Sequence, residues 1–207
     1  NIQIQKNIPV ASGLGGGSSN SAATLIALNR LWGLRLSTND LHPIATSIGS
    51  DVPFFLWGGT STVKGRGELV ELIPPIRLQW FVILSPQSTI ANKTAHTYSL
   101  LNPTHYTQGL HTLGMETSIR ADRVVSPDFI FNTFDQIAID AFPYILEYWD
   151  TFSSISPNNI HIVGSGPSLF THVAAREDGE CLVNTLKNKY GWDARLTSTW
   201  EPKMDLT

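Results

Sequence analysis

Residues 9–23, with the sequence Pro-Val-Ala-Ser-Gly-Leu-Gly-Gly-Gly-Ser-Ser-Asn-Ser-Ala-Ala, constrain this chain more than any other segment. Glycines at positions 13, 15, 16 and 17 remove the Cβ where the backbone must take a positive φ or another group must approach closely. Ser18 to Asn20 are favourable N-cap residues, and the apolar periodicity of residues 21–32 predicts a helix that ends at Gly33. A glycine-rich turn leading into a helix N-terminus collects backbone N–H groups and the positive end of the helix dipole. The segment therefore predicts a phosphate-binding loop rather than a flexible linker.

The common phosphate motifs and several other classes of site do not match. The loop has no Gly-Lys-Ser/Thr ending, and the third glycine of a G-x-G-x-x-G pattern counted from Gly13 would fall on Ser18. A net charge of −3 argues against nucleic acid or a membrane surface as the main partner, and no apolar run is long enough to span a membrane. The single cysteine, Cys181, excludes an internal disulfide and suits a reducing compartment, and the six histidines show no metal-ligand spacing.

Alternating and periodic apolar residues divide the chain into two parts with a boundary at Pro74-Pro75, giving expected domains 1–75 and 76–207. In the first part we expect a strand over residues 1–8, the loop and its helix, a second helix capped at Ser37, Asn39 or Asp40, and a hairpin of residues 60–64 and 68–73. In the second part we expect strands over 78–84, 160–170 (interrupted by a glycine turn) and 194–199. The helices expected there are residues 88–101, a helix from Ser126 that is interrupted at Pro143, and 175–190; residues 102–126 are expected to be a long loop or a frayed helix.

Two further places carry candidate chemistry. Asp51 lies between a glycine turn and the apolar run Val-Pro-Phe-Phe-Leu, where a carboxylate is costly to bury unless it has a partner or a chemical task. From the residues alone, Asp51 either caps a local turn or takes part in chemistry. Thr94 and Tyr98 are four residues apart, so a helix places them on one face; Tyr98 is then either a core residue or part of a binding surface.

The loop, together with Gly-Ser-Asp-Val-Pro-Phe-Phe at 49–55 and Ile-His-Ile-Val-Gly-Ser-Gly-Pro-Ser-Leu-Phe at 160–170, resembles the motifs of the GHMP kinases in their order. The triple glycine and the segment around Asp51 resemble the branch that phosphorylates the 2-hydroxyl of 4-diphosphocytidyl-2-C-methyl-D-erythritol (CDP-methylerythritol) in non-mevalonate isoprenoid biosynthesis. The resemblance implies an α+β, two-domain GHMP kinase fold, with an incomplete N-terminal α/β domain and a ferredoxin-like C-terminal domain. It also implies ATP and Mg²⁺ as cofactors and a location in the cytoplasm or plastid stroma. The small-molecule substrate and ATP are the expected partners, and a homodimer is a further candidate assembly.

The resemblance also assigns roles to individual residues. Asp51 is the expected catalytic base, Thr94 and Tyr98 are expected to bind substrate, with the Tyr98 ring on cytosine, and Ser18 is the expected Mg²⁺ ligand. The residues expected to bind ATP are Lys6, near the nucleotide base, and, around the phosphates, Gly13, Gly15, Gly16, Gly17, Ser18, Ser19, Gly164, Ser165 and Gly166.

The chain also departs from the family pattern. An opening segment Pro-Ala-Lys-Ile-Asn-Leu and a later Asp-Gly-Tyr-His, which hold the lysine partner of the catalytic aspartate and part of the cytosine site, do not occur. We therefore expect a chain that lacks the first strands of its N-terminal domain and is inactive by itself. Two alternatives stay open: another GHMP kinase, acting on mevalonate or a sugar, and a non-catalytic nucleotide-binding homologue.

Overall fold

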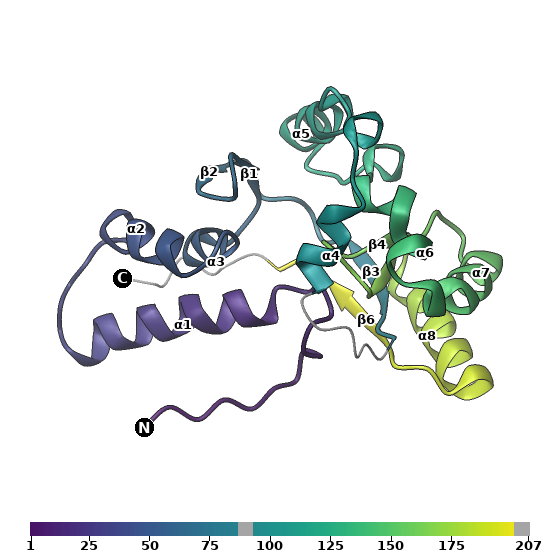
Figure 1. Ribbon diagram of the computed structural model, residues 1–207, viewed down its shortest axis with the longest axis horizontal. Helices are drawn as coiled ribbons and strands as arrows, with labels where there is room; N and C mark the ends of the chain where they lie inside the picture. The colour runs from purple at the N-terminus through teal and green to yellow at the C-terminus, as the bar shows by residue number, and fades with distance from the viewer. Residues whose placement is uncertain (87–92, 201–207) are drawn as a thin grey trace. The chain divides into compact units, whose positions relative to one another are not determined.

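The computed structural model describes residues 1–86 and 93–200, and the chain folds into two compact units (Figure 1). Unit 1 contains Asn1–Leu14 and Arg77–Thr199, and unit 2 is built on Gly15–Ile76. The change of unit after Ile76 lies one residue from the expected boundary, whereas the N-terminal segment packs with the second half of the chain. The division into domains 1–75 and 76–207 stays a prediction.

Unit 2 consists of three helices and a hairpin around a small apolar core. Its elements are α1 (Gly16–Leu31), α2 (Thr38–Ile48), α3 (Val52–Trp57), β1 (Ser61–Lys64) and β2 (Leu69–Leu72). The start of α2 is the capping box that the sequence predicts: Ser37 Oγ accepts from Asp40 N at 3.2 Å, and Asp40 Oδ2 accepts from Ser37 N at 2.8 Å. The Ser37 hydroxyl also donates to Asp40 Oδ2 at 2.6 Å, and this hydrogen bond, together with the one from Ser37 N, lowers the pKa of the Asp40 carboxyl. The buried core residues are Ala22, Leu41, Ala45, Val52 and Leu56.

The first helix differs from its prediction at both ends. It begins at Gly16, five residues before the expected start, with Gly15 as the N-cap at φ 68°, so Ser18 to Asn20 lie inside the helix and cap nothing. Leu31 and Trp32, at the end of the apolar periodic run 21–32, are exposed and do not pack in the core. A glycine in the left-handed conformation can end the loop without a capping side chain, and this is why the helix extends back into the glycine run.

Unit 1 is a four-stranded antiparallel sheet covered by helices, in the strand order β4-β5-β3-β6. Its strands are β3 (Trp80–Leu84), β4 (His161–Ile162), β5 (Leu169–Val173) and β6 (Ala194–Ser198), and β3 pairs with both β5 and β6. This order is that of a ferredoxin-like sheet, as expected for the second half of the chain. Buried side chains from β3 and β5 pack against those of the helices; the largest fully buried ones are Phe142, Phe152, Leu84 and Ile145.

The helical parts of unit 1 are α4 (Lys93–Ser99), α5 (Leu110–Asp122), α6 (Ala138–Ala141), α7 (Leu146–Ile155) and α8 (Arg176–Tyr190). Four short stretches of 3₁₀-helix join them: Pro103–His105, Pro127–Phe129, Thr133–Ile137 and Pro143–Ile145. The predicted helix over residues 88–101 corresponds to α4, and its first residues, 88–92, lie outside the described residues. None of the helices in the described part of the chain has the length and apolar character needed to cross a membrane.

Three sequence expectations for unit 1 are wrong. Residues 1–8 form no strand, and the side chains of Ile2 and Ile4 are 65% and 52% exposed. Residues 110–122 form a regular helix rather than a frayed segment, because Gly109 caps it in the left-handed conformation and the Phe129 ring packs against Gly114. The helix expected from Ser126 is replaced up to Ile137 by two 3₁₀ turns, since Pro127 and the capping box at Asn132 restart the backbone. The expected interruption at Pro143 is present and separates α6 from α7.

Candidate functional site

Ser12 and Gly13, from the first glycine segment, lie against the second glycine segment within unit 1. The carbonyl of Ser12 accepts a hydrogen bond from Ser168 N at 3.1 Å. Gly13 has φ +88°, and a Cβ at that position would overlap the carbonyl oxygen of Val163 and lie 3.0 Å from that of Gly166. Glycine is therefore required at position 13 both for its backbone conformation and for the close approach of the second loop.

The second loop is a tight turn between β4 and β5. Gly164 and Gly166 both have positive φ, at 53° and 77°, and Gly166 N donates to Val163 O at 2.8 Å. A Cβ on Gly164 would lie 3.0 Å from the carbonyl oxygen of Gly13, so the requirement for glycine is reciprocal. The structure thus brings Gly13, Gly164 and Gly166 together, and their role in binding ATP stays a prediction.

Helix α4 reaches the same turn with three side chains. The Lys93 ammonium donates to the carbonyl of Gly166 and lies 3.4 Å from Ser165 Oγ. The Thr94 hydroxyl is 3.3 Å from Ser165 Oγ, and Thr97 Oγ1 donates to the Ser165 carbonyl at 3.4 Å. Lys93 is only 8% exposed, and burial lowers the pKa of its ammonium. The turn therefore has a buried cation and two hydroxyls on one side.

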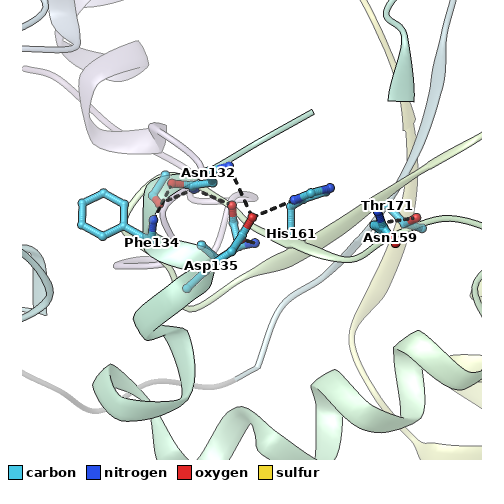
Figure 2. Close-up of polar contacts among 8 residues, drawn as sticks. Asn132, Phe134, Asp135, Asn159, His161 and Thr171 are labelled. Atoms are coloured by element: carbon cyan, nitrogen blue, oxygen red, sulfur yellow. Dashed lines mark hydrogen bonds and ion pairs between the residues drawn. The ribbon is translucent and has the colours of Figure 1, made fainter. Parts of the chain in front are cut away.

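A capping box after α5 holds the other side of the turn (Figure 2). Asn132 Nδ2 donates to the carbonyls of Ile162 and Gly164, both at 2.8 Å. Asp135 Oδ1 accepts from Ile162 N at 2.8 Å, and Asp135 Oδ2 lies 2.7 Å from His161 Nδ1. Figure 2 shows this set of contacts converging on the strand that leads into the turn. Two side chains thus position the backbone of the second glycine loop without belonging to it.

In unit 2, the first turn of α1 carries the remaining predicted phosphate ligands. Its first helical hydrogen bond runs from Ser19 N to Gly15 O at 2.9 Å, so the amides of Gly17 and Ser18 precede it and have no acceptor within the helix. The Ser19 hydroxyl donates to Gly16 O at 3.2 Å, whereas the Ser18 hydroxyl makes no hydrogen bond with any described residue. Of the two serines, Ser18 is the one with an available hydroxyl.

Asp51 is at the N-cap position of α3 but does not cap it. Its side chain is exposed and accepts no hydrogen bond from the first turn of the helix, nor does it pair with any cation in the part of the chain that is described. The interpretation of Asp51 as a turn-capping residue is therefore wrong. Its catalytic role stays a prediction, and so does the Mg²⁺ site, since the described residues include no cluster of three or more His, Cys, Asp or Glu side chains that could hold a metal.

The predicted substrate residues are on the solvent-facing side of α4. Tyr98 is 57% exposed, and its ring meets that of Phe134 edge to face with centroids 4.9 Å apart. Thr94 is exposed beside it on the same helix face. Tyr98 is therefore not a core residue, and one face of its ring remains open to solvent. Lys6 lies in the irregular N-terminal segment with an exposed side chain.

Several residues that build this site are not among the predicted site residues. These residues are Ser12, Thr97, Asn132 and Asp135, and they hold the site through hydrogen bonds to groups that lie far away in the sequence.

Comparison with known proteins identifies the family of this chain. Residues 1–59 match the family model described as the GHMP kinases N terminal domain. A 4-diphosphocytidyl-2-C-methyl-D-erythritol kinase from Dehalococcoides mccartyi is 38% identical over 203 residues, which are 98% of this chain and 71% of the relative. The chain belongs to the GHMP kinases. A kinase of the same name from Enterococcus faecalis is 32% identical over 187 residues, covering 90% of this chain and 65% of the relative.

Solved structures show the same fold as this GHMP kinase. The crystal structure of a 4-(cytidine 5'-diphospho)-2C-methyl-D-erythritol kinase superimposes with a TM-score of 0.76 at 23% identity, covering 94% of this chain and 68% of that one. A homoserine kinase from Cytophaga hutchinsonii superimposes with a TM-score of 0.73 at 19% identity, over 94% of this chain and 68% of that one. As a member of a kinase family, the chain is a phosphotransferase that uses ATP and a small-molecule alcohol.

Proposed function

We propose that this GHMP kinase transfers the γ-phosphoryl group of ATP to the 2-hydroxyl of CDP-methylerythritol. The observation that carries the proposal is the 38% identity, over 98% of the chain, to a kinase named for that substrate. The matched length includes both glycine loops, Asp51 and α4. The packing of Gly13 against Gly164 and Gly166 supports the kinase class, because it brings residues of two glycine motifs of the GHMP kinases into contact.

Phosphoryl transfer depends on positioning and charge neutralisation more than on covalent help from the protein. In our proposal Gly13, Gly15 and the first turn of α1 bind the β- and γ-phosphates through backbone N–H groups. The turn Gly164-Ser165-Gly166 of unit 1 is a further proposed ATP-binding segment, and Lys6 contributes near the nucleotide base.

The residues present fit a Mg²⁺ ion that arrives with the nucleotide. Mg²⁺ in kinases is held by one or two protein oxygens together with the substrate phosphates, so a cluster of carboxylates is unnecessary. The Ser18 hydroxyl is the proposed protein ligand, because it makes no hydrogen bond to any described residue. The ion would offset the negative charge of the transferred group.

Asp51 and α4 would act on the second substrate. An exposed carboxylate without a partner among the described residues can accept a proton from the substrate hydroxyl, which is the role proposed for Asp51. Thr94 would hydrogen-bond the substrate. The open face of the Tyr98 ring would stack on cytosine, because an aromatic face exposed to solvent is a platform for a nucleobase.

A competition assay on the full-length protein tests the substrate. Labelled ATP is offered with CDP-methylerythritol, mevalonate and galactose together, and we expect phosphate to appear only on CDP-methylerythritol. If mevalonate or galactose is phosphorylated in preference to CDP-methylerythritol, the proposed substrate is wrong, although the protein is still a kinase.

A pair of variants tests the phosphate loop. An added Cβ at Gly17 meets no atom within 4 Å, so Gly17→Val should leave the fold intact and abolish ATP binding measured by calorimetry. Ala27→Val, at an exposed position of the same helix, is the matched control and should bind ATP as the wild type does. Unchanged ATP affinity in folded Gly17→Val would remove this loop from the nucleotide site.

A further inference from the structure

Lys93 is a buried cation at the junction of the two glycine loops. Its side chain extends from the start of α4 to the turn Gly164-Ser165-Gly166, where its acceptors are the Gly166 carbonyl and, at 3.4 Å, the Ser165 hydroxyl. Both acceptors are neutral. The position is therefore one at which a full positive charge is held by dipoles alone.

No carboxylate among the described residues pairs with Lys93. The acidic group that also serves this turn, Asp135, is already bound by His161 and by the backbone amide of Ile162. The ion pairs of the described chain lie elsewhere and join Lys64 to Glu71, Arg120 to Glu116, His161 to Asp135, Arg176 to Glu180 and Arg195 to Asp193.

A buried ammonium without a counter-charge is unfavourable for the folded protein, because the lost hydration is not replaced by an ion pair. The lowered pKa of Lys93 expresses the same cost. A lysine that only joined α4 to the turn could be replaced by a neutral donor at lower cost. A bound ligand with a negative charge would offset the cost of burying the Lys93 ammonium.

We propose that Lys93 supplies the positive charge that binds a phosphate group at the junction of the two glycine loops. The inference rests on the proposed function, which brings two phosphate-bearing molecules to the protein: ATP and the diphosphate of the CDP-linked substrate. The hydroxyls of Thr94 and Ser165, 3.3 Å apart beside the ammonium, supply neutral hydrogen-bond donors for the same oxygens.

Lys93→Gln is the variant that tests the charge. The Gln side chain can still donate a hydrogen bond toward the Gly166 carbonyl, so the joining role is kept while the charge is removed. ATP with Mg²⁺ and CDP are titrated separately into wild type and variant by calorimetry, at low and high salt. Lys187→Gln, an exposed lysine on α8, is the matched control for the loss of one charge.

We expect Lys93→Gln to lose at least about tenfold in affinity for one of the two probes, with a weaker salt dependence for that probe. The affected probe identifies the source of the phosphate. The thermal unfolding temperature should stay equal or rise, because an unfavourable buried charge has been removed. Lys187→Gln should match the wild type with both probes.

Equal affinities of wild type and Lys93→Gln for both probes would overturn the inference and leave Lys93 as a structural tie between α4 and the turn. If the Gln variant does not fold, Lys93→Arg and Lys93→Met are compared: binding kept in Arg and lost in folded Met supports the charge, and equal binding in both contradicts it. Binding of neither probe by the wild type would instead refute the proposed function, which separates the two failures.

Discussion

Replacing Gly13 by alanine tests whether the two glycine loops support each other. The added Cβ would overlap the Val163 carbonyl oxygen and lie 3.0 Å from Gly166 O and 3.2 Å from Gly166 N. These are backbone atoms, which cannot rotate away as a side chain would. The alanine would also have to hold φ +88°, a conformation that favours glycine.

Both costs can be put in numbers. A non-glycine residue in a left-handed conformation costs about 1–2 kcal/mol. Forcing extra volume into a packed contact costs about 1–3 kcal/mol. The sum, roughly 2–5 kcal/mol, corresponds to a lowering of Tm by about 4–20 °C for a chain of this size.

Thermal unfolding followed by circular dichroism measures the effect, with Gly17→Ala as the matched control. An added Cβ at Gly17 meets nothing within 4 Å, and alanine is favoured over glycine in a helix, so this variant should gain up to about 1 kcal/mol. If Gly13→Ala unfolds within a degree of wild type, the loop contact is not tight and the reasoning is refuted.

Three further changes have defined outcomes. Asp51→Asn should lower kcat of the full-length protein by about 10²–10⁴, the range for a positioned general base. The Tm of this variant should not change, because the Asp51 carboxylate makes no described hydrogen bond. A kcat within a few fold of wild type would make Asp51 a surface residue only. Tyr98→Ala should weaken CDP binding by about 1–3 kcal/mol and leave ATP binding unchanged; an equal loss for both would mean that the ring only packs against Phe134. His172 should make the free energy of unfolding depend on pH, because burial lowers the pKa of its side chain in the folded state. Below about pH 6.5 the unfolded chain therefore binds more protons than the folded one, and stability falls as the pH falls. Denaturant midpoints measured from pH 7.5 to pH 5 should show this fall, smaller in His172→Gln, and identical slopes would contradict it.

The sequence by itself determined the elements whose signals are local. The capping box at Ser37, the hairpin after Thr60 and the strand-turn-strand at residues 160–170 each depend on residues within a few positions of one another. Capping, turn chemistry and alternation act over that same range. The motif order was likewise enough to identify the kinase family and to single out the glycines of both loops.

Tertiary structure decided what depends on contacts between distant segments. The hydrogen bond from Lys93 to Ser165 spans 72 positions, and the tie from Asn132 to Gly164 spans 32, so neither appears as a periodicity or a motif. Helix α5 also depends on a tertiary contact: its sequence predicts only a loop or a frayed helix, and the Phe129 ring packs against it at Gly114. Helix propensity is weak and packing overrides it. Whether a lysine is a solvated surface charge or a buried cation on a glycine turn is set by the segments that pack around it.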